Sequence, residues 1–341
     1  MVEIIKDFPN QINEACIIGE SIKLSKNYSE YKKILILGMG GSAIGGDLIK
    51  NFLKYTSGAE HLEININRDY SYIPQLDKDS IIIASSYSGN TEETLSSLNQ
   101  AKERTDKIVV ITSGGKLEQI AKENNYDLIK IPSGFQPRAA LAFSFFPILY
   151  FFIKSSLLDN STSLNIENNL DELIQVMKTN STNYSEIHAD NMAYNLAKNM
   201  RDKIPVIYSS QRLEIPNLRW RGQIQENSKR IAFGNIIPEM NHNEINSWEE
   251  NENIHSPFFF LLFKDSDENP RNEKRIDFLF NLLKNQNRPI ELIKTSKSNY
   301  LTRLFEIINL GDWVSFWIAI LNEKDPTEIK TILKLKDHMG A

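Results

Sequence analysis

The chain of 341 residues has a single cysteine, Cys16, and no cluster of metal-ligating residue types. One cysteine cannot form an intrachain disulfide, which is typical of a protein of the reducing cytoplasm. None of the five histidines lies at metal-site spacing from another ligand type: His61, His188, His242, His255 and His338. The sequence therefore predicts no metal and no other cofactor.

Clustered basic charge and long apolar runs are also lacking. The 39 Lys and Arg residues against 44 Asp and Glu give a net charge of −5, and no stretch mixes basic with aromatic residues, so no nucleic-acid partner is expected. The first ten residues do not resemble a secretory signal. Residues 139–153 are strongly apolar, but a membrane span needs about 20 residues. We expect a buried core helix there, in a soluble cytoplasmic protein that does not bind membranes.

Short β-branched segments alternate with helical ones in the first half of the chain. The expected strands are 33–37, 62–66, 80–84, 107–112 and 127–131, and the expected helices are 43–54, 91–100 and 117–123. Continuous apolar strands of this kind are typical of a parallel sheet that is buried on both faces. The alternation predicts a doubly wound α/β domain.

The second half repeats the pattern less regularly. Strands are expected at 205–208, 258–263 and 289–294, and helices at 217–230, 273–285 and 302–321. We therefore predict two doubly wound parallel-sheet α/β domains, each an α-β-α sandwich. The boundary is placed in the polar segment 159–169, which gives domains 1–158 and 159–326 and a C-terminal helix at 327–341 that packs near the active site.

A glycine-rich segment, GMGGSAIGG at 38–46, follows the first expected strand. Glycines there let backbone N–H groups approach an anion, and the N-terminus of the next helix adds its dipole. Gly41 and Ser42 are therefore candidate phosphate-binding residues. No Gly-Lys-Ser/Thr follows, so the segment is not a Walker phosphate loop.

A dinucleotide site is an alternative for the same segment. Gly38, Gly40 and Ala43 satisfy the pattern G-x-G-x-x-G/A. That site also needs an acid at the end of the next strand, whereas Glu63 lies near the start of the expected strand.

Hydroxyl side chains follow the third expected strand, in SSYSGNTEET at 85–94. Ser86, Ser88 and Thr91 flank a glycine turn where a helix begins, and hydroxyls with backbone amides can bind the terminal oxygens of a phosphate. Helix capping by Asn90 or Thr91 is the structural alternative, and it is compatible with phosphate binding. Both loops follow parallel strands, so they are expected in the crevice where α/β proteins bind ligands.

The segments GMGGSAIGGD, SSYSGNTEET, GFQPRAAL, ENSK, NHNEI and GDWVSFW, in this order, resemble the bifunctional phosphoglucose/phosphomannose isomerases. Members of this family are built from two sugar-isomerase (SIS) domains. The resemblance implies metal-independent interconversion of glucose 6-phosphate, and also mannose 6-phosphate, with fructose 6-phosphate through an enediolate. It also implies a homodimer with shared active sites, in which the partner supplies the histidine.

The same resemblance assigns four catalytic residues. Glu226 matches the isomerisation base, His242 the ring-opening residue, Arg138 the cation that stabilises the enediolate, and Lys336 a lysine that assists ring opening. These residue types suit that chemistry, which needs a carboxylate, an acid/base and a cation. From the residues alone, Glu226 could instead be a solvated helix residue paired with Arg230, and His242 a surface histidine.

The sequence is also compatible with two other functions, and it offers two candidates for one specificity residue. SIS domains also occur in non-catalytic sugar-phosphate-binding regulators, although about 30 residues before the first strand leave little room for a DNA-binding domain. An NAD-dependent oxidoreductase is the other rival. In the family a C-terminal threonine permits mannose 6-phosphate, and both Thr327 and Thr331 lie in the corresponding region.

Overall fold

A computed structural model of the chain describes residues 1–71, 76–249 and 256–340. The chain forms two compact units, Asp7–Ile174 (the first unit) and Met1–Lys6 with Gln175–Ala341 (the second unit). The polar segment in which the boundary was expected is largely a helix, α7 (Asn160–Asn168). It belongs to the first unit because Thr162 Oγ1 donates to the Ser57 carbonyl oxygen at 3.0 Å.

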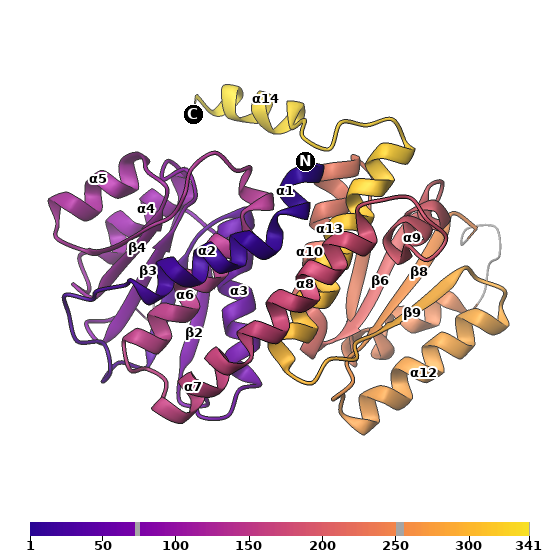
Figure 1. Cartoon of the computed structure of the whole chain (residues 1–341), viewed down its shortest axis with the longest axis horizontal. Helices are drawn as coiled ribbons and strands as arrows, with labels where there is room; N and C mark the ends of the chain where they lie inside the picture. The colour runs from indigo at the N-terminus through magenta and orange to yellow at the C-terminus, as the bar shows by residue number, and fades with distance from the viewer. Residues whose placement is uncertain (72–75, 250–255, 341) are drawn as a thin grey trace. The chain divides into compact units, whose positions relative to one another are not determined.

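The first unit is built on a five-stranded parallel sheet of order β2-β1-β3-β4-β5 (Figure 1). Its strands are β1 (Lys33–Leu37), β2 (Glu63–Asn67), β3 (Ser80–Ser85), β4 (Ile108–Thr112) and β5 (Asp127–Lys130), which confirms the five expected strands to within one residue at each end. β1 and β3 lie side by side, with Leu37 opposite Ala84. The loops that follow these two strands therefore leave the sheet next to each other.

Helices cover both faces of this sheet. They are α2 (Phe8–Glu20), α3 (Gly40–Lys54), α4 (Glu92–Ala101), α5 (Gly115–Glu123), η1 (Pro137–Ala139), α6 (Leu141–Lys154) and α7. α4 and α5 pack on the face that carries Leu35, Ile82 and Val110. α3 packs on the opposite face, where Gly46 lies against Ile36. The apolar segment 139–153 is confirmed as a buried core helix, α6.

The second unit has a four-stranded parallel sheet of order β7-β6-β8-β9. Its strands are β6 (Ile204–Ser210), β7 (Phe233–Ile237), β8 (Phe258–Lys264) and β9 (Ile290–Lys294). β7 was not expected from the sequence. It lies at the sheet edge, contains Gly234 and Asn235, and is largely part-exposed, so it lacks the continuous apolar character of a buried strand.

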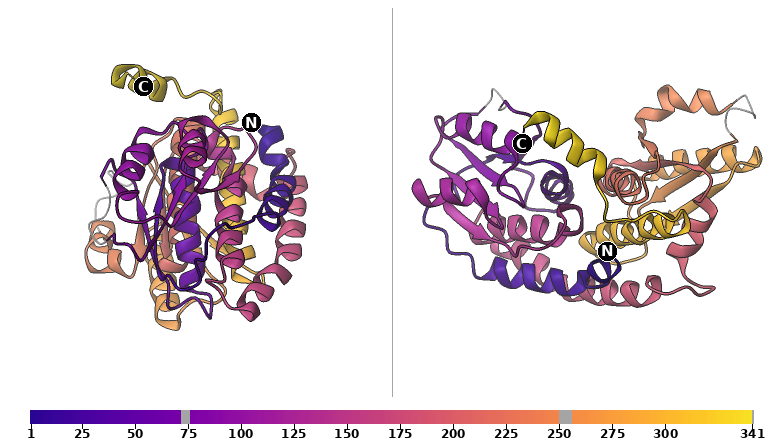
Figure 2. Two further views of the ribbon diagram at one scale, coloured as in Figure 1. Left: turned by 90° about the vertical axis from the view of Figure 1, so that its left-hand side faces the viewer. Right: turned by 90° about the horizontal axis from the view of Figure 1, so that it is seen from above.

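The helices of the second unit include the expected α10 (Glu214–Ser228), α12 (Pro270–Asn285), α13 (Tyr300–Leu321) and α14 (Lys330–Met339). The others are α1 (Val2–Lys6), the end of α8 (Leu170–Tyr184), α9 (Met192–Met200), η2 (Gln211–Leu213), η3 (Glu239–His242) and η4 (Glu244–Trp248). α12 packs on the face of Val206 and Phe260. α10 packs on the other face, where the rings of Trp220 and Phe263 lie 5.0 Å apart. α14 has no buried residue and stands clear of the sheet of its own unit (Figure 2).

α10 and α13 are locked together by four side chains (the α10–α13 lock): Arg219, Trp220, Gln223 and Asp312. Trp220 Nε1 donates to the Ile307 carbonyl oxygen at 2.7 Å. Arg219 contacts both carboxylate oxygens of Asp312, at 3.1 and 2.9 Å, and Gln223 Nε2 donates to Asp312 Oδ1 at 2.8 Å. All four side chains are buried, so the lock forms a polar seam within the core of the unit.

α13 is also the one helix in the described part of the chain that is long and apolar enough to cross a membrane. In its most apolar stretch 83% of the residues are buried inside the molecule, against α10 and α9. Packing in the core of this unit therefore accounts for its composition.

The lock predicts a stability difference between two helical glycines. A Cβ at Gly311 of α13 would lie 2.3 Å from Trp220 Nε1, whereas a Cβ at Gly222 of α10 meets nothing within 4 Å. Overpacking of this kind costs about 1–3 kcal/mol. Gly311→Ala should therefore lower the thermal midpoint Tm by about 2–10 °C. Gly222→Ala is the matched control and should leave Tm equal or higher, since alanine suits an exposed helix better than glycine. Equal Tm values for the two variants would contradict the close approach.

Candidate active site

The loop after β1 positions Gly41 and Ser42 at the start of α3. Met39 is the N-cap residue, and Gly40 has φ +49°. A Cβ on Gly41 would lie 2.6 Å from the Pro137 carbonyl oxygen, so glycine is required for the close approach of these two segments. Ser42 is 6% exposed. The N-terminus of a 15-residue helix thus lies beside a small polar loop, which suits an anion.

The loop after β3 turns so that its hydroxyls lie together. Ser86 Oγ and Thr91 Oγ1 are 2.8 Å apart, and Ser86 Oγ accepts from the Gly89 N–H at 3.1 Å. Gly89 has φ +70°, and a Cβ there would lie 1.8 Å from the Gly114 carbonyl oxygen, so no other residue fits. The exposed Ser88 accepts from the Asn90 N–H at 3.2 Å.

Capping does not account for the hydroxyl of Thr91. Thr91 is the N-cap residue of α4, but its side chain makes no capping hydrogen bond within the part of the chain that the structure describes. Asn90, the other capping candidate, accepts from the Lys116 N–H at 3.1 Å, which lies on another helix. The Ser86–Thr91 pair therefore remains beside the N-terminus of α4, where both oxygens can face an anion.

The two loops and Arg138 come together within the first unit. The Tyr87 N–H donates to Ser42 Oγ at 3.3 Å, and the Tyr87 hydroxyl accepts from the Phe135 N–H at 2.8 Å. Burial raises the pKa of Tyr87, although the bond from Phe135 opposes that shift. Arg138 follows Pro137 in η1 and is 5% exposed, so its charge is held inside the fold close to the Gly41 turn.

The dinucleotide alternative is not supported by the position of Glu63. Glu63 is the first residue of β2 and pairs with Lys33, the first residue of β1. It therefore lies at the amino edge of the sheet, whereas the glycine loop lies at the carboxyl edge. A dinucleotide site needs its acid at the carboxyl edge.

Glu226 lies near the end of α10 and is half-buried. The α10–α13 lock and a bond from Asn227 Nδ2 to Ser315 Oγ, 2.9 Å long, fix this end of the helix. The helix ends at Ser228, and Lys229 is left-handed with φ 57°. Arg230 lies outside the helix and donates to the Lys203 carbonyl oxygen at 3.2 Å, so helical spacing does not bring it to Glu226.

His242 ends η3 and is exposed. Two residues later, Glu244 anchors the turn: its carboxylate accepts from Asn235 Nδ2 at 2.7 Å and from the Tyr208 hydroxyl. Burial raises the pKa of Tyr208, and the charge of Glu244 adds to the shift, so Tyr208 stays protonated as the donor. Sequence reasoning missed this anchor, although Glu244 belongs to the NHNEI motif.

The two remaining expectations concern Lys336 and metal binding. Lys336 is in α14, where every described residue is exposed. Among the described residues no group of three His, Cys, Asp or Glu side chains could hold a metal ion, and His255 lies outside those residues. The structure thus brings Gly41, Ser42, the Ser86–Thr91 loop and Arg138 together in the first unit, and places Glu226, His242 and Lys336 in the second.

Known proteins resemble this chain in sequence and in fold. A family model described as the SIS domain matches residues 27–143, and one described as the bacterial phospho-glucose isomerase C-terminal SIS domain matches residues 189–339. The fold resembles the C-terminal domain of glucosamine-fructose-6-phosphate aminotransferase from Francisella tularensis, with a TM-score of 0.70 at 14% identity, covering 96% of this chain and 98% of that one.

Two curated relatives match along nearly their whole length. The bifunctional phosphoglucose/phosphomannose isomerase of Caldicellulosiruptor bescii is 38% identical, covering 100% of this chain and 99% of the relative. The protein of the same name from Aquifex aeolicus is 33% identical, covering 99% and 97%. With both SIS domains matched and the chain aligned end to end, it belongs to the bifunctional phosphoglucose/phosphomannose isomerase family.

Proposed function

We propose that the chain interconverts glucose 6-phosphate and fructose 6-phosphate, and also converts mannose 6-phosphate to fructose 6-phosphate, without a metal. The observation that carries this proposal is the pair of loops in the first unit, where hydroxyls and helix N-termini converge beside a buried arginine. Such a site suits the phosphate of a sugar and leaves the far end of the sugar for chemistry. The names of the full-length relatives point to the same reaction.

The proposed roles follow the needs of the reaction. Ser42, Ser86, Ser88 and Thr91, with the backbone at Gly41, bind the phosphate. Once the ring is open, Glu226 takes the proton from C2 and returns it to C1. Arg138 stabilises the negative oxygen of the enediolate between these two transfers. His242 moves the proton in ring opening, and Lys336 assists it.

Dual specificity follows from the intermediate. Glucose 6-phosphate and mannose 6-phosphate differ only at C2, the carbon that becomes planar in the enediolate, so one base can serve both. Thr327 and Thr331 are the candidates for tolerating either C2 hydroxyl. Thr327 is held in a turn, since its Oγ1 and N–H both donate to Asp325 Oδ1, at 2.6 and 2.7 Å, whereas Thr331 is exposed on α14.

Glu226→Gln tests the reaction and its base together. The amide keeps the shape of the side chain but cannot accept the proton, and loss of a general base costs about 10²–10⁴-fold in turnover. We expect that loss in a coupled assay of glucose 6-phosphate formation from fructose 6-phosphate, with little change in KM. Glu214→Gln, the same substitution at the exposed start of α10, is the control.

The wild-type rate should persist after exhaustive treatment with EDTA. A loss below about tenfold in Glu226→Gln would exclude Glu226 as the base. If the wild-type chain bound fructose 6-phosphate without turning it over, the chain would instead be a non-catalytic sensor of the SIS type.

Replacement of Ser88 and Thr91 by alanine tests the phosphate site. Each hydrogen bond to a charged group contributes about 1.5–3 kcal/mol, so the double variant should bind fructose 6-phosphate at least about tenfold more weakly. Turnover should fall as well, because phosphate binding positions the reacting carbons. Ser96→Ala, which removes a hydroxyl from the middle of α4, is the control. Unchanged affinity in a folded double variant would place the phosphate elsewhere.

Mixing two inactive variants tests the proposed homodimer with shared sites. If His242 serves the Glu226 of the partner, a dimer of one Glu226→Gln chain and one His242→Ala chain holds one intact site. Random pairing makes about half of the dimers mixed, so activity should recover to roughly a quarter of wild type. Each variant refolded alone is the control. Confirmed subunit exchange without recovered activity would show that each site uses residues of one chain.

A further inference from the structure

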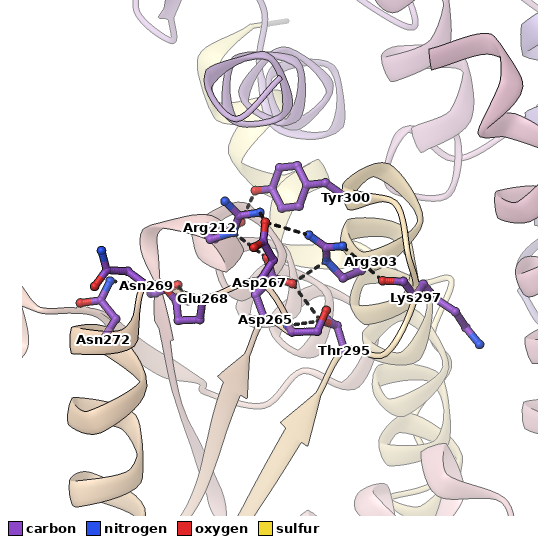
Figure 3. Close-up of polar contacts among 12 residues, drawn as sticks. Arg212, Asp265, Asp267, Glu268, Asn269, Asn272, Thr295, Lys297, Tyr300 and Arg303 are labelled. Carbon is purple, nitrogen blue, oxygen red and sulfur yellow. Dashed lines mark hydrogen bonds and ion pairs between the residues drawn. The ribbon is translucent and has the colours of Figure 1, made fainter. Parts of the chain in front are cut away.

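The carboxyl edge of the sheet in the second unit carries a cluster of charged side chains that the proposed isomerisation does not use. It comprises two arginines, two aspartates and a tyrosine: Arg212, Asp265, Asp267, Tyr300 and Arg303 (Figure 3). Arg212 follows β6, the aspartates follow β8, and Tyr300 and Arg303 lie in the first turn of α13. We refer to it as the two-arginine cluster.

Asp265 is the fixed anion of this cluster. It is fully buried and lies 2.6 Å from the Nε atoms of both Arg212 and Arg303, and it accepts from Thr295 Oγ1 at 2.9 Å. Burial alone would raise the pKa of Asp265, but the bond from Arg212 and the charge of Arg303 hold that pKa below its usual range. One carboxylate between two guanidinium groups leaves the buried part of the cluster with a net charge of one positive unit.

The exposed carboxylate of Asp267 pairs with the two arginines that carry this positive charge. Its carboxylate lies 3.1 Å from Arg212 Nη2 and 3.7 Å from Arg303 Nη2, while its side chain is 75% exposed. The arginine side chains, by contrast, are only 14% and 5% exposed. An ion pair with so exposed a partner contributes little to stability, so Asp267 can rotate away at small cost.

The two guanidinium groups would stay in place without Asp267. The Tyr300 ring packs 4.6 Å from the Arg212 guanidinium carbon, and its hydroxyl donates to the Arg212 carbonyl oxygen at 2.5 Å. Arg303 Nη1 donates to the Ser298 carbonyl oxygen at 2.8 Å. The loop itself is held by Glu268, which accepts from the Ser210 hydroxyl. Rotation of Asp267 therefore exposes a rigid pair of N–H donors.

The place of this cluster in the second sheet matches the place of the phosphate loops in the first. β6 lies between β7 and β8 as β1 lies between β2 and β3, with parallel pairing in both cases. Residues 265–269 after β8 thus correspond in topology to the hydroxyl loop after β3. α/β sheets bind ligands at this edge. In the second sheet the carboxylate of Asp267 occupies the position where a ligand would bind.

We propose that the two-arginine cluster is a second anion-binding site, at which a doubly charged phosphate group replaces the carboxylate of Asp267. Arg212 and Arg303 would each donate from Nη2, and forked donors of this kind suit phosphate oxygens. The site goes beyond the isomerisation and does not depend on it.

Removal of the competing carboxylate tests the proposal. Asp267→Asn is made in the Ser88→Ala, Thr91→Ala chain, so that the loop after β3 contributes less to phosphate binding, and inorganic phosphate is titrated by calorimetry. We expect phosphate to bind at least about fivefold more tightly than in the parent double variant, because the amide carries no charge to compete for the arginines. Adding Arg303→Lys, which keeps the charge but loses the fork, should reverse the gain.

Asp277→Asn is the matched control, since Asp277 is also an exposed carboxylate paired with a cation of the same unit, Lys264 at 3.1 Å. It should leave phosphate affinity unchanged. The proposal is overturned if Asp267→Asn does not tighten phosphate binding, or if Asp277→Asn tightens it equally. Measuring the effect of Asp267→Asn on glucose 6-phosphate affinity in the same chain identifies the source: a larger gain than for inorganic phosphate indicates a phosphorylated sugar, and a smaller gain indicates free phosphate. Either result requires that the two-arginine cluster binds an anion.

Discussion

The buried pairing of Arg219 with Asp312 is the constraint on which the second unit depends. Both side chains lie within the core between α10 and α13, where an unpaired charge would be costly. Removal of one partner from a buried pair costs about 3–5 kcal/mol, whereas loss of an exposed pair costs about 0–1 kcal/mol. The pair can form in only one rotation and one register of α10 against α13. That register fixes the position of Glu226 on α10.

Two motifs that carry the family resemblance contain residues that serve packing and anchoring. In GDWVSFW, Gly311 makes room for Trp220 and Asp312 binds Arg219, so both residues serve packing between helices. In NHNEI, Glu244 holds the turn that carries His242. A motif that identifies an enzyme family can thus consist mainly of residues that position the few reacting groups.

Much of this architecture could be predicted from the sequence, and the exceptions have physical causes. β1 and β3 are continuous apolar segments buried on both faces, and their bounds follow from composition. The edge strand β7 has no such signature, and α7 is polar because it lies at the surface of its unit. The loop that contains Ser86 and Thr91 could be predicted because its hydroxyl residues lie close together in the sequence. The anchoring of Glu244 by Tyr208 joins residues 36 positions apart, so no local pattern reveals it.

The second unit is formed by two segments that are distant in the sequence, and this affects when it can fold during synthesis. α1, whose Ile5 is buried, contacts α13, so residues 2–6 pack against a helix that begins only at residue 300. At about 5–20 residues per second, the ribosome needs on the order of 15–60 s to pass from α1 to α13. The first unit lies between them in the chain and can fold while α1 waits. The second unit can therefore be completed only after α13 has been synthesised, when α1 can pack against it.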